Sequence, residues 1–152
     1  MKKILLLLLV ITSLTMCKES SRKLSNETNP QPTFKGLDSV NYKSKTEIEK
    51  YLKNKGYTFS NTQPRADQWK SNNNEEIIQF NGKGVIVFLT FNNDYYNQLL
   101  RDLKKTEYKS SGTSIKNNVE VESYSKGNET IYSSSMINPK NNKKVYTLTF
   151  IN

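Results

Sequence analysis

The side chains that could do chemistry are few, and their types limit the reactions open to this chain. Its 152 residues include no histidine and one cysteine, Cys17. Intrachain disulfides, Cys/His zinc sites and mechanisms that need an imidazole are therefore excluded. A serine nucleophile such as one of Ser133-Ser134-Ser135 would need a lysine base, and no Ser-x-x-Lys precedes a convincing helix. The sequence predicts no catalytic residue, no metal site and no cofactor, and we expect no enzyme.

The acidic residues do not gather into a site. Glu75 and Glu76 are adjacent, so on a strand they point to opposite faces. Glu120 and Glu122 share a face, but their alternation with valines predicts the solvent side of a strand. The Gly82–Gly84 segment is too short for a phosphate loop and joins two predicted strands. These patterns favour ordinary surface and turn positions.

Apolar and aromatic residues on predicted strands are the remaining candidates for a functional surface. Aromatic side chains with scattered lysines can bind carbohydrate, peptide or nucleic acid. The binding candidates are Trp69, Ile86, Phe88, Tyr124 and Tyr132. They either form an exposed patch on a sheet or fill a core that is poor in leucine and isoleucine.

The N-terminus is typical of an exported protein. A positive start, Met1-Lys2-Lys3, precedes an apolar run from Ile4 to Ile11, which is the pattern of a secretory signal. Leu14-Thr15-Met16-Cys17 resembles a bacterial lipobox, although a small residue usually stands where Met16 does. That resemblance implies that residues 1–16 are a signal peptide and that lipidated Cys17 anchors the protein to a membrane. The alternative is an ordinary signal peptide with an incidental cysteine.

Residues 17–44 are rich in Ser, Thr, Asn and Pro and predict a flexible tether. Lys18-Glu19 resembles the signal that sends lipoproteins to the cell surface in some Gram-negative lineages. We therefore expect an outer-membrane lipoprotein of the cell envelope, exposed at the surface. The net charge of +9 permits contact with anionic lipid, sugar or an acidic protein. Nucleic acid is not an expected partner of an exported protein.

Residues 45–152 predict one α+β domain, with halves 45–91 and 92–152. Ser44 with Glu47, or Thr46 with Glu49, predicts a capping box before a helix over 45–55. A second helix should begin near Asp94, with its apolar stripe at Tyr96, Leu99, Leu100 and Leu103. Each helix is followed by predicted strands, and both halves close on Leu-Thr-Phe. This order predicts an antiparallel sheet of six to eight strands with two helices on one face, as a tandem α-β-β-β repeat. The alternative is two unrelated stretches that share a tripeptide.

The repeated tripeptide also predicts which strand residues face the core. Aligning Leu89-Thr90-Phe91 with Leu148-Thr149-Phe150 gives both strands a common core face. That face would carry Val85, Val87, Leu89, Phe91, Tyr146, Leu148 and Phe150. Ile86 and Phe88 then point away from the helices, toward solvent or a partner.

These features favour a non-enzymatic envelope lipoprotein whose sheet face binds another protein. Tandem helix-plus-sheet units resemble the architecture of secreted β-lactamase-inhibitor proteins and of some small envelope-assembly lipoproteins. The resemblance implies that an inhibitor, immunity or assembly role is one option, but it carries no motif residues. The alternative is a glycan-binding or small-molecule-binding module, with or without weak hydrolytic activity. A purely structural spacer is a third interpretation.

Overall fold

The computed structural model describes residues 31–63, 66–81 and 83–152. The folded unit within this range runs from Pro32 to Asn152 and has an α+β fold. The predicted signal peptide, Cys17 and the first part of the predicted tether lie outside the described residues.

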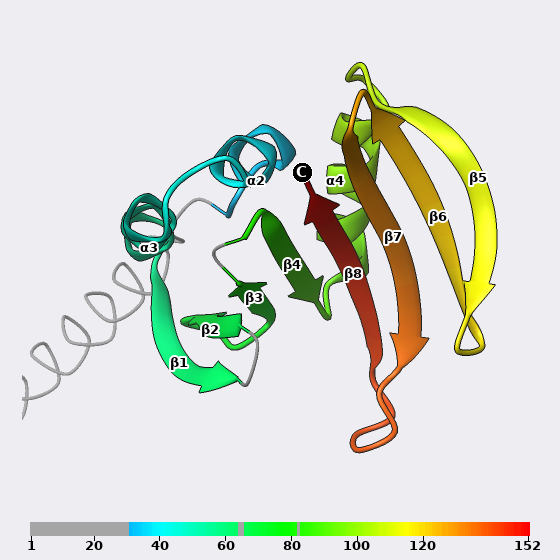
Figure 1. The fold of residues 1–152 in the computed structure, drawn as a ribbon. Coiled ribbons are helices and arrows are strands. Elements are labelled where there is room, and N and C mark those ends of the chain that lie inside the picture. The colour runs from blue at the N-terminus through cyan, green and yellow to red at the C-terminus, as the bar shows by residue number, and fades with distance from the viewer. Residues whose placement is uncertain (1–30, 64–65, 82) are drawn as a thin grey trace, which may run out of the picture. The chain divides into compact units, whose positions relative to one another are not determined.

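All strands of the described residues belong to one eight-stranded antiparallel sheet in the order β1-β2-β3-β4-β8-β7-β6-β5 (Figure 1). The helices of the described chain are α2 (Phe34–Val40), α3 (Lys45–Asn54) and α4 (Asn93–Leu103). The strands are β1 (Tyr57–Gln63), β2 (Ala66–Ser71), β3 (Glu76–Phe80), β4 (Val85–Thr90), β5 (Lys109–Lys116), β6 (Val119–Lys126), β7 (Glu129–Ile137) and β8 (Lys144–Ile151).

The sheet consists of two meanders that meet in its middle. Strands β1 to β4 pair in chain order, and so do β5 to β8. The meanders are joined where β4 pairs with β8, with Val85 opposite Ile151 and Phe88 opposite Leu148. Both edge strands have a register irregularity near their start, at residues 59–61 in β1 and 110–112 in β5. Irregularities of this kind protect an edge strand from pairing with another chain.

Helix α2 was not predicted, and it corrects the predicted tether. Thr33 caps it, because its Oγ1 accepts a hydrogen bond from the Gly36 amide at 3.1 Å. One side of the helix buries Phe34, Leu37 and Val40 in the core. The prediction that residues 17–44 form a tether is therefore wrong from Pro32 onward. The prediction of two helices is also wrong, because the described residues form three.

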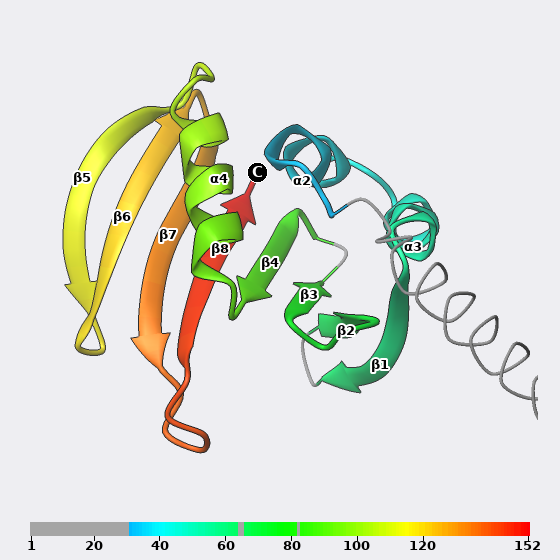
Figure 2. The same ribbon diagram turned by 180° about the vertical axis from the view of Figure 1, so that it is seen from behind.

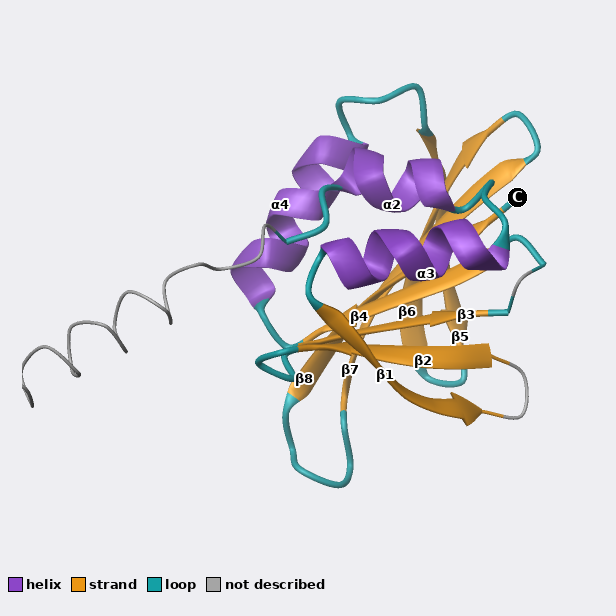
Figure 3. Ribbon diagram, turned by 90° about the vertical axis from the view of Figure 1, so that its left-hand side faces the viewer, coloured by secondary structure: helices purple, strands orange, loops and turns teal. Residues whose placement is uncertain are grey.

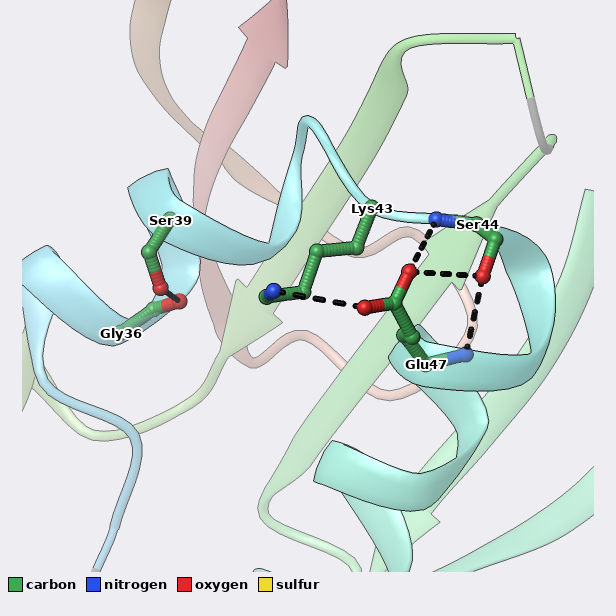
Figure 4. A network of polar contacts seen from close by, with 5 residues as sticks. All are labelled: Gly36, Ser39, Lys43, Ser44 and Glu47. Carbon is green, nitrogen blue, oxygen red and sulfur yellow. Dashed lines mark hydrogen bonds and ion pairs between the residues drawn. The ribbon is translucent and has the colours of Figure 1, made fainter.

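Helix α3 begins with the predicted capping box of Ser44 and Glu47 (Figure 4). Ser44 Oγ accepts from the Glu47 amide at 3.4 Å, and the Ser44 amide donates to Glu47 Oε2 at 3.1 Å. Lys43 Nζ lies 3.5 Å from Glu47 Oε1 and adds an ion pair at the same end. The box satisfies amides that a helix N-terminus otherwise leaves unpaired.

Helix α4 packs on the second meander and presents the predicted stripe. Tyr96, Leu99 and Leu103 are buried, and Leu100 is half-buried. Seen from behind, the helix lies in front of β7 and β8 (Figure 2). Its Tyr96 hydroxyl lies 2.6 Å from Ser133 Oγ on β7, which fixes the helix against the sheet. The N-cap is Asn92, not the predicted Asp94, and its side chain accepts from the Tyr95 amide at 3.0 Å.

One core joins the helices, which lie next to one another (Figure 3), to alternate residues of the strands. Its centre contains Ile86, Phe88, Leu148 and Phe150, with Ile86 and Phe88 at 1% and 0% exposure. The predicted faces of β4 are thus inverted, because Val85, Val87 and Leu89 are only half-buried.

The inversion has a simple cause in the strand register. Phe88 is opposite Ile78 on β3, and Phe150 is opposite Ile131 on β7. Phe88 therefore corresponds to Phe150, whereas the tripeptide alignment placed Phe91 there. A shift by an odd number of residues moves every side chain of a strand to the other face.

Candidate binding surface

Most of the predicted binding residues lie in the core. Trp69, Ile86, Phe88 and Tyr124 have exposed fractions of 3%, 1%, 0% and 2%. The predicted exposed patch of Trp69, Ile86 and Phe88 therefore does not exist, and Tyr124 is not accessible either. Tyr132 is partly exposed and lies on the other side of the sheet, beside Ser123 and Thr149.

The side of the sheet that points away from the core, which we call the outer face, contains Tyr132. Side chains alternate along a strand, so the residues between the buried ones make up this face. Its members are Thr58 and Asn61 on β1; Ala66, Gln68 and Lys70 on β2; Ile77 and Gln79 on β3; Val85, Val87 and Leu89 on β4; Lys109, Gly112, Ser114 and Lys116 on β5; Val119, Val121, Ser123 and Ser125 on β6; Thr130, Tyr132, Ser134 and Met136 on β7; and Val145, Thr147, Thr149 and Ile151 on β8.

The middle of the outer face is apolar with short hydroxyl side chains. Thr149 on β8 lies between Val87 and Tyr132 of the neighbouring strands. Val121 and Val145 are buried, although neither belongs to the core formed with the helices. Their own neighbours on the outer face must therefore shelter them from water. Such a surface can bury apolar area against a partner without leaving large polar groups unpaired.

Charge is distributed unequally between the two sides of the sheet. Every Asp or Glu in a described strand lies on the core side. These residues are Asp67, Glu76, Glu120, Glu122 and Glu129. Lys70, Lys109 and Lys116 lie on the outer face, which carries no carboxylate among its described strand residues. The fixed charge of this face is therefore positive.

One outer-face lysine contacts the candidate that remained accessible. Lys116 Nζ lies 4.4 Å from the centre of the Tyr132 ring, within the range of a cation–π contact. Sequence reasoning missed Lys70, Lys109 and Lys116 as a set. The signal that could have found them is the alternation of side chains along a strand, which places every second residue on the same side of the sheet.

A second polar cluster ties α2 to the second meander. The Tyr108 hydroxyl lies 2.9 Å from Asp38 Oδ1 and 2.5 Å from Glu129 Oε2. Lys126 Nζ is 3.4 Å from Glu129 Oε2 and 5.2 Å from the Tyr108 ring centre. The single phenol proton is shared by two carboxyls, so the two contacts compete for it.

The two carboxyls of this cluster differ in proton affinity. Burial raises the pKa of Asp38 above its usual value, while the hydrogen bond from Tyr108, with a second contribution from Tyr42, lowers the pKa of Glu129. Asp38 is therefore the carboxyl that holds the proton more readily. The cluster has the features of a structural tie between α2 and β7, since its groups are saturated by one another.

A hollow lies at the tip of the β5–β6 hairpin. It is lined by Thr113, Ser114, Ile115, Asn118 and Glu120. Ile115 is 78% exposed, and none of the predicted aromatic candidates lines this hollow. Convergent polar and aromatic groups, which a small-molecule site uses, are not assembled there.

Comparison with protein-family models, curated proteins and solved structures finds no match to this chain. Within residues 31–63, 66–81 and 83–152, no three His, Cys, Asp or Glu side chains are placed to hold a metal ion. In the same ranges no helix is both long and apolar enough to cross a membrane.

Proposed function

We propose that this chain is a non-enzymatic lipoprotein of the cell envelope that binds a partner protein through the outer face of its sheet. The envelope part of the proposal is supported by the sequence before the folded unit. The positive start, the apolar run from Ile4 to Ile11 and Cys17 after Leu14-Thr15-Met16 together favour export and lipidation. Two or more acyl chains would anchor the protein stably, where a single chain is marginal.

We also propose that the fold is a diverged tandem repeat of a helix and four strands, with its helices on one face. Equivalent contacts in the two halves support this. The Tyr57 hydroxyl lies 3.5 Å from Glu76 Oε2, as the Tyr108 hydroxyl lies 2.5 Å from Glu129 Oε2. In both cases the tyrosine follows the helix and the glutamate begins the third strand. The irregularities near the starts of both edge strands add a second correspondence.

The observation that carries the binding function is the composition of the outer face. Val87, Thr149 and Tyr132 lie side by side in its centre, and the charged side chains lie toward its two edges. An apolar centre surrounded by a polar rim is the usual anatomy of a protein–protein interface. This surface replaces the patch expected from the sequence.

The experiment that tests the binding function blocks the centre of the outer face without changing charge. Full-length protein with a C-terminal affinity tag is purified from the cell that makes it, and co-purifying proteins are identified and remade for direct binding measurements. Thr149→Tyr places a large side chain between Val87 and Tyr132, in a residue type that strands tolerate well. We expect it to abolish binding of the identified protein.

Thr46→Tyr is the matched control, because Thr46 is an exposed residue on α3. It makes the same substitution away from the outer face and should bind like the wild type. A specific partner that binds the Thr149→Tyr protein normally would refute the use of this face.

The lipoprotein part has its own test. Labelled palmitate should enter the wild-type protein, and Cys17→Ser should both prevent labelling and release the protein from the membrane fraction. Labelling that persists in Cys17→Ser would show that Cys17 is not the acylated residue.

A further inference from the structure

The unequal distribution of charge over the sheet indicates what kind of protein the outer face can accept. The strand carboxylates lie on the core side, where several have cationic or phenolic partners. Asp67 forms an ion pair with Lys45 at 2.5 Å, and Glu129 forms one with Lys126 at 3.4 Å. On the outer face, Lys70 and Lys116 have no carboxylate beside them among the described strand residues.

We propose that the outer face binds a protein whose contact surface is acidic, with carboxylates that meet Lys70 on one flank and Lys109 and Lys116 on the other. This inference rests on the proposed function, since it concerns the same face. Opposite charges across an interface speed association and select the correct partner. The uncharged centre supplies the apolar area that such an interface also needs.

The spacing of the lysines favours a protein over a membrane surface. Lys70 lies on β2, next to the edge strand β1, and Lys116 lies on the opposite edge strand, β5. Six spacings of about 4.8 Å separate the two strands along the sheet, roughly 29 Å, so these charges are far apart. Binding to anionic lipid uses clusters of several adjacent Lys or Arg residues. The outer face has no such cluster, and no arginine lies among its described residues.

The same charges argue against a second copy of this chain as the occupant. A symmetric dimer through the outer face would bring positive rims together, and the described strand residues of that face include no carboxylate to neutralise them. The size of the face suits a standard interface. A sheet roughly 34 Å wide and about six residues high covers several hundred Å², close to the roughly 800 Å² that each partner of a stable complex buries.

Zero-length cross-linking tests this proposal directly. A carbodiimide joins a lysine amine to a carboxylate that already contacts it, with no spacer. Full-length tagged protein is cross-linked in freshly broken cells, purified, and the linked peptides are identified. We expect links from Lys70, Lys109 or Lys116 to Asp or Glu residues of one protein.

Charge-reversal variants then measure the contribution of these lysines with the identified protein. Lys70→Glu/Lys116→Glu should weaken binding about tenfold or more, and binding should weaken as salt rises. Lys70→Arg/Lys116→Arg should restore wild-type affinity. The matched control is Lys35→Glu/Lys50→Glu, which makes the same charge change at exposed helix positions. Circular dichroism and thermal melts establish that each variant is folded.

The outcomes separate this inference from the proposed function. A partner lost with Thr149→Tyr but indifferent to salt and to Lys70→Glu/Lys116→Glu would overturn the acidic partner and leave the binding face in place. A partner indifferent to both variants would overturn both. Links that join two copies of the chain, or no links from these lysines, would overturn the acidic partner. Binding of the wild-type protein alone to vesicles of equal parts phosphatidylcholine and phosphatidylglycerol, without a protein partner, would also overturn the acidic partner.

Discussion

Replacing Leu37 by alanine should destabilise the whole domain, because α2 is part of the core. The side chain is fully buried, at 0% exposure. The substitution removes three carbon groups, which is worth about 2.4 kcal/mol of transfer free energy at about 0.8 kcal/mol each. The cavity left behind adds to this, so we expect a loss of about 3 kcal/mol in the free energy of unfolding. For a domain of this size the melting temperature should fall by about 12 °C.

Urea titration followed by circular dichroism, together with thermal melts, measures this loss. Lys35→Ala is the control on the same helix, since Lys35 is exposed, and it should change stability by no more than about 0.5 kcal/mol. A Leu37→Ala protein that melts within about 2 °C of the wild type would refute the placement of α2 in the core. The same result would restore the sequence-based view that the folded unit begins near Lys45.

The remaining predictions concern one helix cap, one polar cluster and one strand face. Ser44→Ala removes the cap of α3 and should cost about 1 kcal/mol in urea titrations, where no change would mean that the capping box is unimportant. Tyr108→Phe should cost about 2 kcal/mol at neutral pH, since its hydroxyl bonds charged Glu129. That bond holds the pKa of Glu129 below its usual value, so its stabilisation exists above the unfolded-state pKa and is lost as pH falls through the folded-state pKa. Wild type and variant should therefore converge in acid, and a gap that widens there would contradict this. Ile86→Lys buries a charge and should unfold the protein at room temperature, whereas Leu89→Lys on the outer face should leave it folded, as circular dichroism would show.

Hydrophobic periodicity predicted the elements in which the apolar pattern repeats over several turns. Helix α4 carries Tyr96, Leu99 and Leu103 on one side over three turns, and its packing needs nothing beyond that stripe. Helix α2 is only seven residues long and contains Gly36, so its Phe34, Leu37 and Val40 spacing gives little signal among prolines and serines. Thr33 before that spacing is a helix N-cap and was the available clue.

The candidate site was harder to predict than the fold. The face of β4 depends on register, and Leu-Thr-Phe occurs in both closing strands at positions that do not correspond. Composition alone cannot separate the sides of a strand in which every residue from Val85 to Leu89 is apolar. The positive charge of the outer face could not be predicted from the sequence, because Lys70 and Lys116 belong to strands that are far apart in the chain. Only the pairing of the strands places both lysines on the same side of one sheet.

The pairing of β4 with β8 has a consequence for how the chain is made. Phe88 lies opposite Leu148 on β8, which is synthesised after all the other described strands. Contacts this distant in sequence form late and slow the folding of a sheet. Until residues 144–151 emerge, the first meander ends in the unpaired edge of β4, which is an aggregation hazard. A chain that lacks β8 would keep that hazard permanently, so truncation before residue 144 should yield insoluble protein instead of a smaller working domain.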